Sequence, residues 1–349
     1  MRAMTGKPAL VPTLIHTGQH YDQAMSARFF QDLQIRPPDI NLEVGSGSHA
    51  LQTAHVMQRL DPILEALRPD LVLVVGDVNS TVAAAITAVK RSITVAHVEA
   101  GLRSFDRSMP EEINRILTDA VADLLFVTEE SARVNLLREG VDPVRIHFVG
   151  NVMIDALESS RRQWECSSIF DMLGVEPGAT YAVLTLHRPS NVDDEGTLGN
   201  LMRQMLAISS RLPLLFSVHP RTRKKLEEFK LWPALQSASG IKLTEPLGYV
   251  EFMALVKAAR AVVTDSGGVQ EESTYLGIPC LTLRENTERP ITVTQGSNRL
   301  VAADELSQKL DIVLSGQWPQ GSRPDRWDGQ AAQRCVAALQ RRHESKRIS

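Results

Sequence analysis

Short apolar segments alternate with amphipathic segments along most of the chain. In the first half, continuous apolar runs predict strands at 10–16, 70–75, 93–98, 124–128 and 146–149. Apolar residues at helical spacing predict the intervening helices at 22–33, 49–67, 81–90, 111–121 and 131–139. The strands lack apolar–polar alternation, as expected when helices cover both faces of a parallel sheet. The pattern therefore predicts βαβ units and an α/β fold.

The same alternation restarts in the second half. It predicts strands at 181–186, 214–218, 241–243, 261–264 and 280–283, and helices at 196–210, 221–229, 250–259 and 269–276. A polar, irregular stretch at 166–180 separates the halves, and a Pro/Gly-rich connector at 319–328 precedes a last helical segment. We expect two doubly wound, Rossmann-like domains facing a cleft, at 1–165 and 166–328, with a helix at 329–345 packing back on the first.

Composition narrows the class of protein. The 349 residues are 43% hydrophobic and 23% charged, which is ordinary for a globular protein. A net charge of −3 gives no electrostatic case for a nucleic-acid partner. The three cysteines show no metal-ligand spacing, and no apolar run predicts a membrane span or a signal peptide. We expect a cytoplasmic protein without a membrane partner.

A strand-to-helix turn near residue 265 is the strongest candidate for a ligand-binding site. The apolar strand ends in Thr-Asp, and Ser266-Gly267-Gly268 then opens a helix. The first N–H groups of a helix have no intrahelical partner and suit a diphosphate. Glu272 and its neighbour Glu271, about one turn in, are placed to reach a sugar hydroxyl pair. Alone, this stretch also fits an ordinary strand–helix turn.

Carboxylates follow three neighbouring strands or their connections in the first half, at Asp77, Glu99 and Glu111. If they converge, they can move a proton at a carbon centre or protonate an oxygen. The structural alternatives are a helix cap for Asp77, an ion pair between Glu99 and Arg103, and an interaction of Glu111 with the helix dipole. The cluster lacks the histidine-rich ligand set of a tightly bound transition metal, so we expect none.

Cations in the second half follow strands in the same way. His187 and Arg188 come directly after the strand at 181–186, where an arginine can grip a diphosphate bidentately. Arg289 lies on a loop after the strand at 280–283. These positions favour an anion-binding site together with the turn at Ser266.

Taken together, the motifs resemble the non-hydrolysing UDP-N-acetylglucosamine 2-epimerase family. The resemblance covers nearly the whole chain in the right order. Its blocks are His16-Thr-Gly-Gln-His-Tyr21, Gly76-Asp-Val-Asn-Ser80, His97-Val-Glu-Ala-Gly-Leu-Arg103, Pro110-Glu-Glu-Ile-Asn-Arg115, Val149-Gly-Asn151, His187-Arg188, Asp265-Ser-Gly-Gly-Val-Gln-Glu-Glu272 and Thr287-Glu-Arg-Pro290.

The resemblance implies a glycosyltransferase-B-like fold whose second domain holds most of the UDP. It implies inversion at C2 of UDP-GlcNAc to give UDP-ManNAc, a precursor of surface polysaccharides. The implied route eliminates UDP to form 2-acetamidoglucal and then adds it back. This chemistry needs neither a nicotinamide nor a metal cofactor, and family members are commonly homodimers.

Residue by residue, the resemblance implies catalytic roles for Asp77, Glu99, Glu111 and His187, and any of the three carboxylates could take the C2 proton. It implies contacts to the substrate or UDP by Arg115, Arg188, Leu247, Phe252, Ser266, Gly267, Gly268, Glu272 and Arg289. Gln19 and His20 fall where some bacterial members bind a second, activating UDP-GlcNAc.

One departure concerns the N-terminus. Family members begin with a strand and a Gly-x-Arg-Pro loop whose arginine reaches the phosphates, whereas this sequence starts at Met1-Arg-Ala-Met-Thr5, which is similar to the end of the following helix. Either the start codon was assigned too late, the sequence was trimmed, or the protein lacks this element. In the last two cases we expect the first sheet to lack a central strand and an anion contact, and for the chain as written we expect weak or no turnover. Two other functions stay open: a glycosyltransferase, because it shares the fold, and an inactive UDP-sugar-binding protein, because the N-terminal loop is absent.

Overall fold

The computed structural model describes residues 1–18, 30 and 32–348, without the side chains of 345–348. Gln19, His20 and most of the helix expected at 22–33 lie outside these residues. Contacts divide the chain into two compact units, Met1–Ala156 with Asp325–Ser349 (unit 1) and Leu157–Pro324 (unit 2). The sequence pattern placed the first boundary later, at 165/166. Within 157–165, α7 (Arg161–Glu165) contacts α13 (Tyr249–Ala258) and buries Trp164, so this segment belongs with unit 2.

Unit 1 contains a parallel sheet in the order β3-β4-β5-β6. These strands span Leu71–Val75, Thr94–Ala100, Leu124–Val127 and Ile146–Phe148. A separate parallel pair joins β1 (Ile15–His16) to β2 (Ile40–Asn41). The remaining elements are η1 (Arg2–Met4), α2 (His49–Leu67), α3 (Asn79–Lys90), α4 (Pro110–Val121), α5 (Glu130–Arg138), η2 (Pro143–Arg145) and α17 (Ala331–Ile348), while α6 (Val152–Ser159) crosses the unit boundary.

Helix α2 shows how sequence specifies a local element in unit 1. The side chain of Ser48 accepts a hydrogen bond from the N–H of Leu51 and caps the first turn. Val56, Leu60 and Leu64 recur at intervals of four, so they form one buried stripe. That stripe packs into the same core as β3 to β5.

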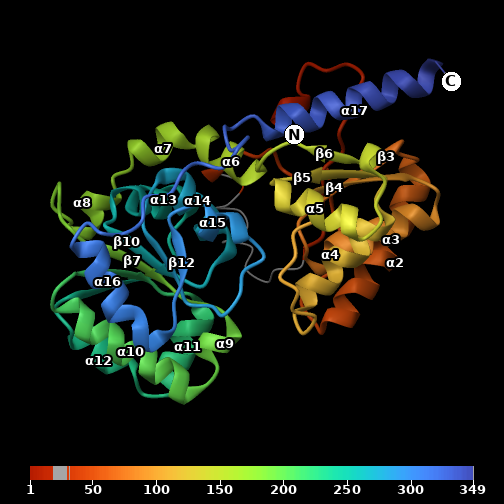
Figure 1. Cartoon of the computed structure of the whole chain (residues 1–349). Helices are drawn as coiled ribbons and strands as arrows, with labels where there is room; N and C mark the ends of the chain where they lie inside the picture. The colour runs from red at the N-terminus through yellow and green to blue at the C-terminus, as the bar shows by residue number, and fades with distance from the viewer. Residues whose placement is uncertain (19–29, 31, 349) are drawn as a thin grey trace. The chain divides into compact units, whose positions relative to one another are not determined.

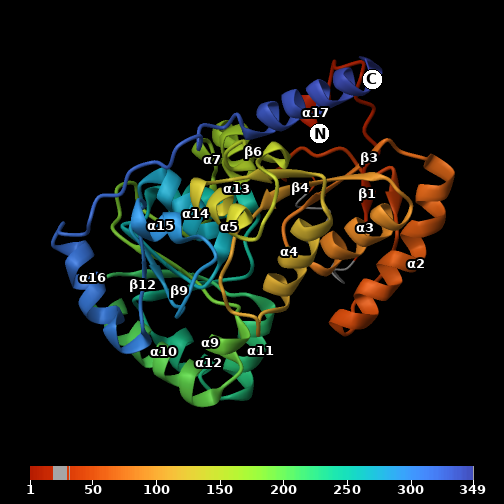
Figure 2. The same ribbon diagram turned by 45° about the vertical axis from the view of Figure 1, so that its right-hand side comes forward.

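Both faces of the unit 1 sheet are covered, as the continuous apolar strands predict. One face belongs to a core shared with the helices between the strands. On the other face, Val98 and Phe126 pack against Cys335, Ala338 and Leu339 of α17. Figures 1 and 2 show α17, in blue, running along this sheet with the N-terminus beside it. The expectation that the last helix packs on the first half agrees with this arrangement.

Unit 2 contains a parallel sheet in the order β12-β11-β10-β7-β8-β9. These strands are, in chain order, β7 (Ala182–Thr185), β8 (Leu214–Ser217), β9 (Ile241–Thr244), β10 (Ala261–Thr264), β11 (Cys280–Thr282) and β12 (Asn298–Leu300). The chain builds outward from β7 to β9 and then returns to pair β10 with β7. The carboxyl ends of β7 and β10 therefore meet at a switch in strand order, where ligands of such sheets bind.

The helices of unit 2 connect these strands. They are α7, α8 (Ile169–Leu173), α9 (Pro189–Val192), α10 (Glu195–Ser209), α11 (Pro220–Glu228), α12 (Trp232–Ser237), α13, α14 (Gly267–Leu276), α15 (Pro290–Thr294), η3 (Ala303–Glu305) and α16 (Leu306–Leu314). The stretch at 166–180, expected to be an irregular link, holds α8 and lies within this unit. Among the helices described, none is long and apolar enough to cross a bilayer.

Candidate functional site

Asp77 follows β3 and lies beside a buried arginine. The guanidinium of Arg115, whose side chain is 2% exposed, pairs with the Asp77 carboxylate, which is 22% exposed. The side-chain amide of Asn114 donates to the Asp77 carbonyl oxygen at 2.9 Å. The capping alternative is wrong, because Val78 is the N-cap of α3 and no side chain caps that helix. Asp77 is instead a partly exposed carboxylate held by α4.

Glu99 lies at an irregularity in β4. Its φ is +74°, in the left-handed region that a residue with a Cβ rarely occupies, and the register of β4 with β5 shifts between Val98 and Ala100. A Cβ built at Gly76 would lie 3.6 Å from Glu99 Oε2. The bulge therefore aims the Glu99 carboxylate at the loop that carries Asp77. Strain of this kind is frequent where a side chain must point in a functional direction.

Helix α4 carries the third expected carboxylate. Glu111 is half-buried in its first turn, one turn before Arg115 and so on the same helix face. Arg115 also pairs with buried Glu112 at 2.7 Å, and Glu112 accepts backbone N–H groups at Ser104 and Phe105 at 3.0 Å. In this structure Arg115 links α4 to Asp77, a role additional to the substrate contact expected of it.

A buried network behind these carboxylates was not anticipated from the sequence. His97 Nδ1 lies 2.7 Å from Asp119, and its Nε2 lies 2.9 Å from the Gly76 carbonyl oxygen. Arg103 pairs with Asp119 at 2.7 Å and with Glu139 at 2.6 Å. Burial alone would raise the pKa of Asp119, but hydrogen bonds and charge from His97 and Arg103 leave it lowered. The network ties β4 to the Gly76 loop.

In unit 2, Asp265 lies at the centre of a hydrogen-bond network, as Asp119 does in unit 1. Its carboxylate is fully buried and accepts the backbone N–H groups of His187 at 3.1 Å and Arg188 at 2.9 Å, and the side-chain amide of Asn191 at 3.1 Å. His187 Nδ1 lies 3.0 Å from the same carboxylate. Burial raises the pKa of Asp265, but the contacts to His187, Arg188 and Asn191 outweigh burial and lower it. An ionised Asp265 thus fixes the orientation of His187 at the switch point.

The N-terminus of α14 lies directly after Asp265. Ser266 is the N-cap but forms no capping bond with its side chain, and Ser266, Gly267 and Gly268 are all half-exposed. A Cβ at Gly267 would lie 2.7 Å from Nη1 of Arg289, so glycine there lets the guanidinium approach the helix start. Arg289 pairs with Glu271 at 3.0 Å. The structure therefore brings Ser266, Gly267, Arg289, His187 and Arg188 together at one end of the sheet.

Two charged residues of this group were not predicted. Glu288 accepts from Arg284 at 2.7 Å, pairs with Arg289, and lies 3.9 Å from Arg188. Burial would raise the pKa of Glu288, but Arg289 and Arg284 lower it strongly. Residues 284–288 form a loop between β11 and α15, so the i, i+4 rule for helices gives no local sequence signal for this pair. Glu288 holds the arginines close together.

Glu272 is 3% exposed and points into the interior of unit 2. Burial raises its pKa to about 7, an effect that Tyr249 reduces. Burial and Glu272 in turn raise the pKa of Tyr249. Hydrogen bonds donated by a ligand, such as those from a pair of ribose hydroxyls, would stabilise the ionised form of this buried carboxylate.

Leu247 and Phe252 flank the start of α13. Both are half-buried, and the N–H of Leu247 donates to Ser217 Oγ at 3.4 Å. The exposed apolar surface of the two side chains is suited to a planar base. Among the residues that the structure describes, no group of three or more His, Cys, Asp or Glu side chains is arranged to hold a metal ion.

Comparisons with known proteins agree with this geometry. A family model described as UDP-N-acetylglucosamine 2-epimerase matches residues 2–340. A UDP-N-acetylglucosamine 2-epimerase of Methanocaldococcus jannaschii is 44% identical over 310 residues, covering 86% of this chain and 84% of that protein. The crystal structure of the UDP-GlcNAc 2-epimerase of that organism with UDP-GlcNAc and UDP is similar at a TM-score of 0.89 and 42% identity, covering 97% and 94% of the two chains. A UDP-2,3-diacetamido-2,3-dideoxy-D-glucuronate 2-epimerase of Pseudomonas aeruginosa is 39% identical over 306 residues, covering 86% and 83%.

The two Rossmann-like sheets define an α/β protein of glycosyltransferase-B-like fold. The match along nearly the whole chain narrows that class to one group. The chain belongs to the UDP-N-acetylglucosamine 2-epimerase family. The fold class and the family that the motifs predict are both confirmed.

Proposed function

We propose that this protein interconverts UDP-GlcNAc and UDP-ManNAc without hydrolysing the nucleotide. The observation that supports this most directly is the buried Asp265 carboxylate, which orients His187 beside the α14 N-terminus in a chain of this family. His187 and the α14 N-terminus together form an anion-binding site for a leaving diphosphate. The carboxylates of unit 1 supply the proton transfer that inversion at a carbon requires.

In this proposal unit 2 binds the UDP. The N–H groups of Gly267 and Gly268 and the hydroxyl of Ser266 face the diphosphate, with Arg188 and Arg289 neutralising its charge. Glu272 accepts the ribose hydroxyls, and Leu247 and Phe252 contact the uracil. His187, held by Asp265, stabilises the charge that develops on the departing UDP.

The proposed reaction has two balanced halves. A carboxylate among Asp77, Glu99 and Glu111 takes the proton from C2 as the C1–O bond breaks, so that UDP leaves with the electron pair and a C1–C2 double bond forms. The β-phosphate oxygen then adds back to C1, and C2 receives a proton on the opposite face from a second of these carboxylates in its protonated form. Both carboxylates then return to their starting protonation states by exchange with solvent. The pairing of Asp77 with Arg115 and the bulge at Glu99 hold two of these carboxylates at one loop.

Proton NMR of UDP-GlcNAc with the protein in deuterated water tests the reaction. We expect deuterium at C2, formation of UDP-ManNAc, and UDP release only as a minor product, all without an acceptor. Release of UDP that depends on an added acceptor would instead identify a glycosyltransferase. UDP binding with no C2 exchange would identify an inactive binding protein.

The same assay addresses sugar specificity, and a separate measurement addresses assembly. The Pseudomonas aeruginosa relative is named for a diacetamido uronate, so UDP-GlcNAc should be compared with UDP-sugars substituted at C3 and C6. We also propose a homodimer, as the family resemblance implies. Light scattering should then give twice the chain mass of 38.5 kDa.

A further inference from the structure

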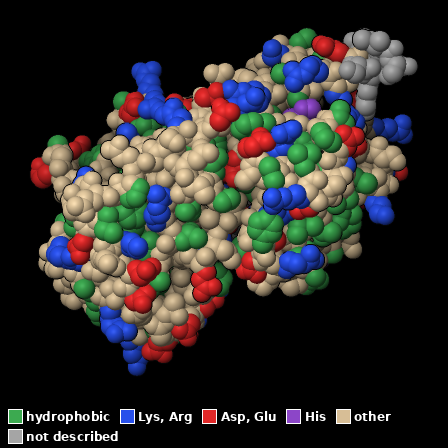
Figure 3. Space-filling view, in the orientation of Figure 1, with side chains coloured by type: hydrophobic (Ala, Val, Ile, Leu, Met, Phe, Trp, Pro, Cys, Tyr) green, Lys and Arg blue, Asp and Glu red, His purple; other side chains and the backbone are tan. Residues whose placement is uncertain are grey.

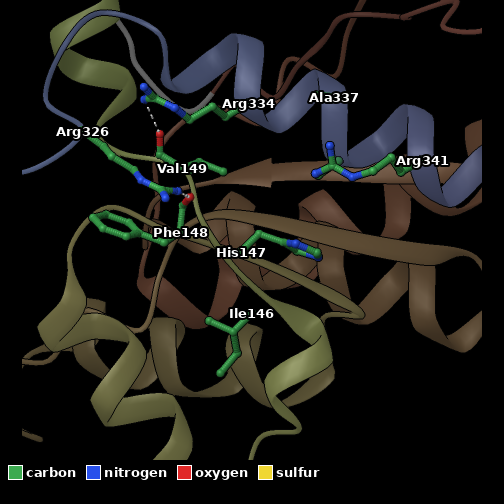
Figure 4. Close-up of a pocket in the computed structure, with 9 residues that line it drawn as sticks. Ile146, His147, Phe148, Val149, Arg326, Arg334, Ala337 and Arg341 are labelled. Atoms are coloured by element: carbon green, nitrogen blue, oxygen red, sulfur yellow. Dashed lines mark hydrogen bonds between the residues drawn. The ribbon is translucent and has the colours of Figure 1, made fainter.

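Unit 1 contains a pocket that none of the proposed UDP or proton-transfer residues line. It lies where α17 covers β6 and has a volume of about 350 Å³ (Figure 4). Strand β6 and the residue after it form one wall, α17 forms the opposite wall, and Arg326 of the returning connector closes one end. The volume falls within the range of small-molecule sites.

The lining is strongly basic. It includes Arg326, Arg334, Arg341 and His147, and among the described side chains that line the pocket none is acidic. Arg334 pairs with Asp328, which does not line the pocket, and donates to the Val149 carbonyl oxygen at 3.0 Å. In Figure 3, Lys and Arg side chains gather along α17 and beside it. The pocket therefore selects against cations.

The arginines at the closed end are positioned before any ligand arrives. Arg326 lies 4.6 Å above the Phe148 ring and donates to the Phe148 carbonyl oxygen. Figure 4 shows both this bond and the one from Arg334 as dashed lines. Guanidinium groups fixed by packing lose less entropy on binding than free ones, which favours a specific site.

His147 supplies an unsatisfied polar atom. Its Nε2 is buried and has no hydrogen-bond partner among the described residues, while its ring lies 5.6 Å from that of Phe126. Burial, followed by the charges of Arg341 and Arg342, lowers the pKa of His147. An orphaned buried nitrogen is costly, and a ligand with hydrogen-bonding oxygens would remove that cost.

The walls are fixed by the way the chain returns to unit 1. Gly150 has a φ of +92°, and a Cβ there would clash with the Arg326 carbonyl oxygen. The Trp327 indole is buried and donates to the Thr128 carbonyl oxygen at 3.3 Å. Asp155 accepts the first N–H groups of α17 at 3.0 and 2.7 Å. These contacts make the pocket a built feature of the fold.

We propose that this pocket binds the phosphate group of a small molecule, through Arg326, Arg341 and His147. Arginine matches phosphate oxygens in bidentate geometry. Ala337, Ala338 and the Phe148 ring offer apolar surface to the rest of the ligand. This pocket is additional to the proposed UDP-binding site, because that site belongs to unit 2 and none of its residues line the pocket.

NMR of the His147 imidazole, assigned with a His147→Gln variant, tests the proposal on the full chain. Titration with inorganic phosphate should shift the His147 resonances saturably and raise its pKa, because a bound anion stabilises the imidazolium. Arg341→Gln, at an exposed position of α17, should weaken phosphate binding about tenfold. Arg203→Gln on α10 is the matched control and should change nothing.

Two further arms identify the source of the phosphate and guard against misfolding. Glucose 6-phosphate binding more tightly than inorganic phosphate would indicate a phosphomonoester, and the reverse order would indicate the free ion. Ala337→Glu places a carboxylate in the pocket and should abolish binding while thermal stability is retained. The proposal is overturned if millimolar phosphate leaves His147 unchanged, if sodium chloride at equal ionic strength reproduces the shift, or if Arg341→Gln binds as the wild type does.

Discussion

Replacing Asp265 by asparagine should destabilise unit 2 and disorient His187. The carboxylate is fully buried and accepts hydrogen bonds from two backbone N–H groups and the Asn191 amide, with His187 Nδ1 also at 3.0 Å. An asparagine keeps one accepting oxygen and presents an NH2 group to the remaining donors. At least one buried N–H is left without a partner, which costs about 1–3 kcal/mol, and the charge assistance is lost as well. We expect a loss of about 3 kcal/mol in the free energy of unfolding.

Urea unfolding followed by tryptophan fluorescence measures this loss, because Trp164, Trp232 and Trp318 lie in unit 2 and only Trp327 of the four lies in unit 1. The control is Asp193→Asn, which breaks an exposed ion pair with Arg221 and should cost less than about 1 kcal/mol. UDP affinity and C2 exchange should fall only for the Asp265 variant.

The pH dependence has a defined sign. The pKa of Asp265 is lowered in the folded protein, so its contribution is present above the unfolded pKa of about 3.9 and disappears as the pH falls through the folded pKa. The difference between the wild type and Asp265→Asn should therefore be constant from pH 5 to 8 and shrink in more acidic solution. Equal stability of the two proteins at neutral pH would refute the role of this carboxylate.

Further predictions concern single residues. Burial raises the pKa of Glu272 to about 7, so wild-type stability should decline as the pH rises from about 4.5 to 7. Glu272→Gln should lack that decline, gain roughly 3 kcal/mol at pH 8 and bind UDP more weakly by calorimetry. Gly267→Ala should displace Arg289 and lower UDP affinity with little change in melting temperature, while Gly199→Ala, which has open space, should stabilise by about 0.5–1 kcal/mol. Asp77→Asn should strongly reduce C2 exchange measured by NMR and leave UDP affinity unchanged; undiminished exchange would contradict a catalytic role for Asp77.

Periodicity recovered the long elements because each carries its own signal. The bounds of α2 match the expected 49–67, and β10 matches 261–264. Short elements carry too few residues to show a period, which is why β12 was missed. The strand expected at 10–16 is reduced to Ile15–His16, since Pro12 cannot donate to a ladder in that run.

The candidate site likewise contains residues that the local sequence predicts and residues that it does not. Groups placed by their own strand, such as the α14 start, follow from the local sequence. Asp265 does not, because its partners at His187 and Asn191 lie 78 and 74 positions away and only the β7–β10 pairing brings them near. Asp119 is hidden for the same reason, since it reads as a polar helix residue until β4 places His97 against it.

Asp119 and Asp265 explain why the two units can each present reactive groups at the end of an apolar sheet. Each is a buried carboxylate whose pKa is lowered by a histidine and further donors, and each holds a loop that follows a neighbouring strand. Because these buried carboxylates hold the loops in place, Glu99 and His187 can be oriented without being buried themselves. They stay partly exposed, at a bulge in β4 and after β7, where a ligand can reach them. Buried positioning groups with exposed partners are what a proton-transfer site and an anion grip both require.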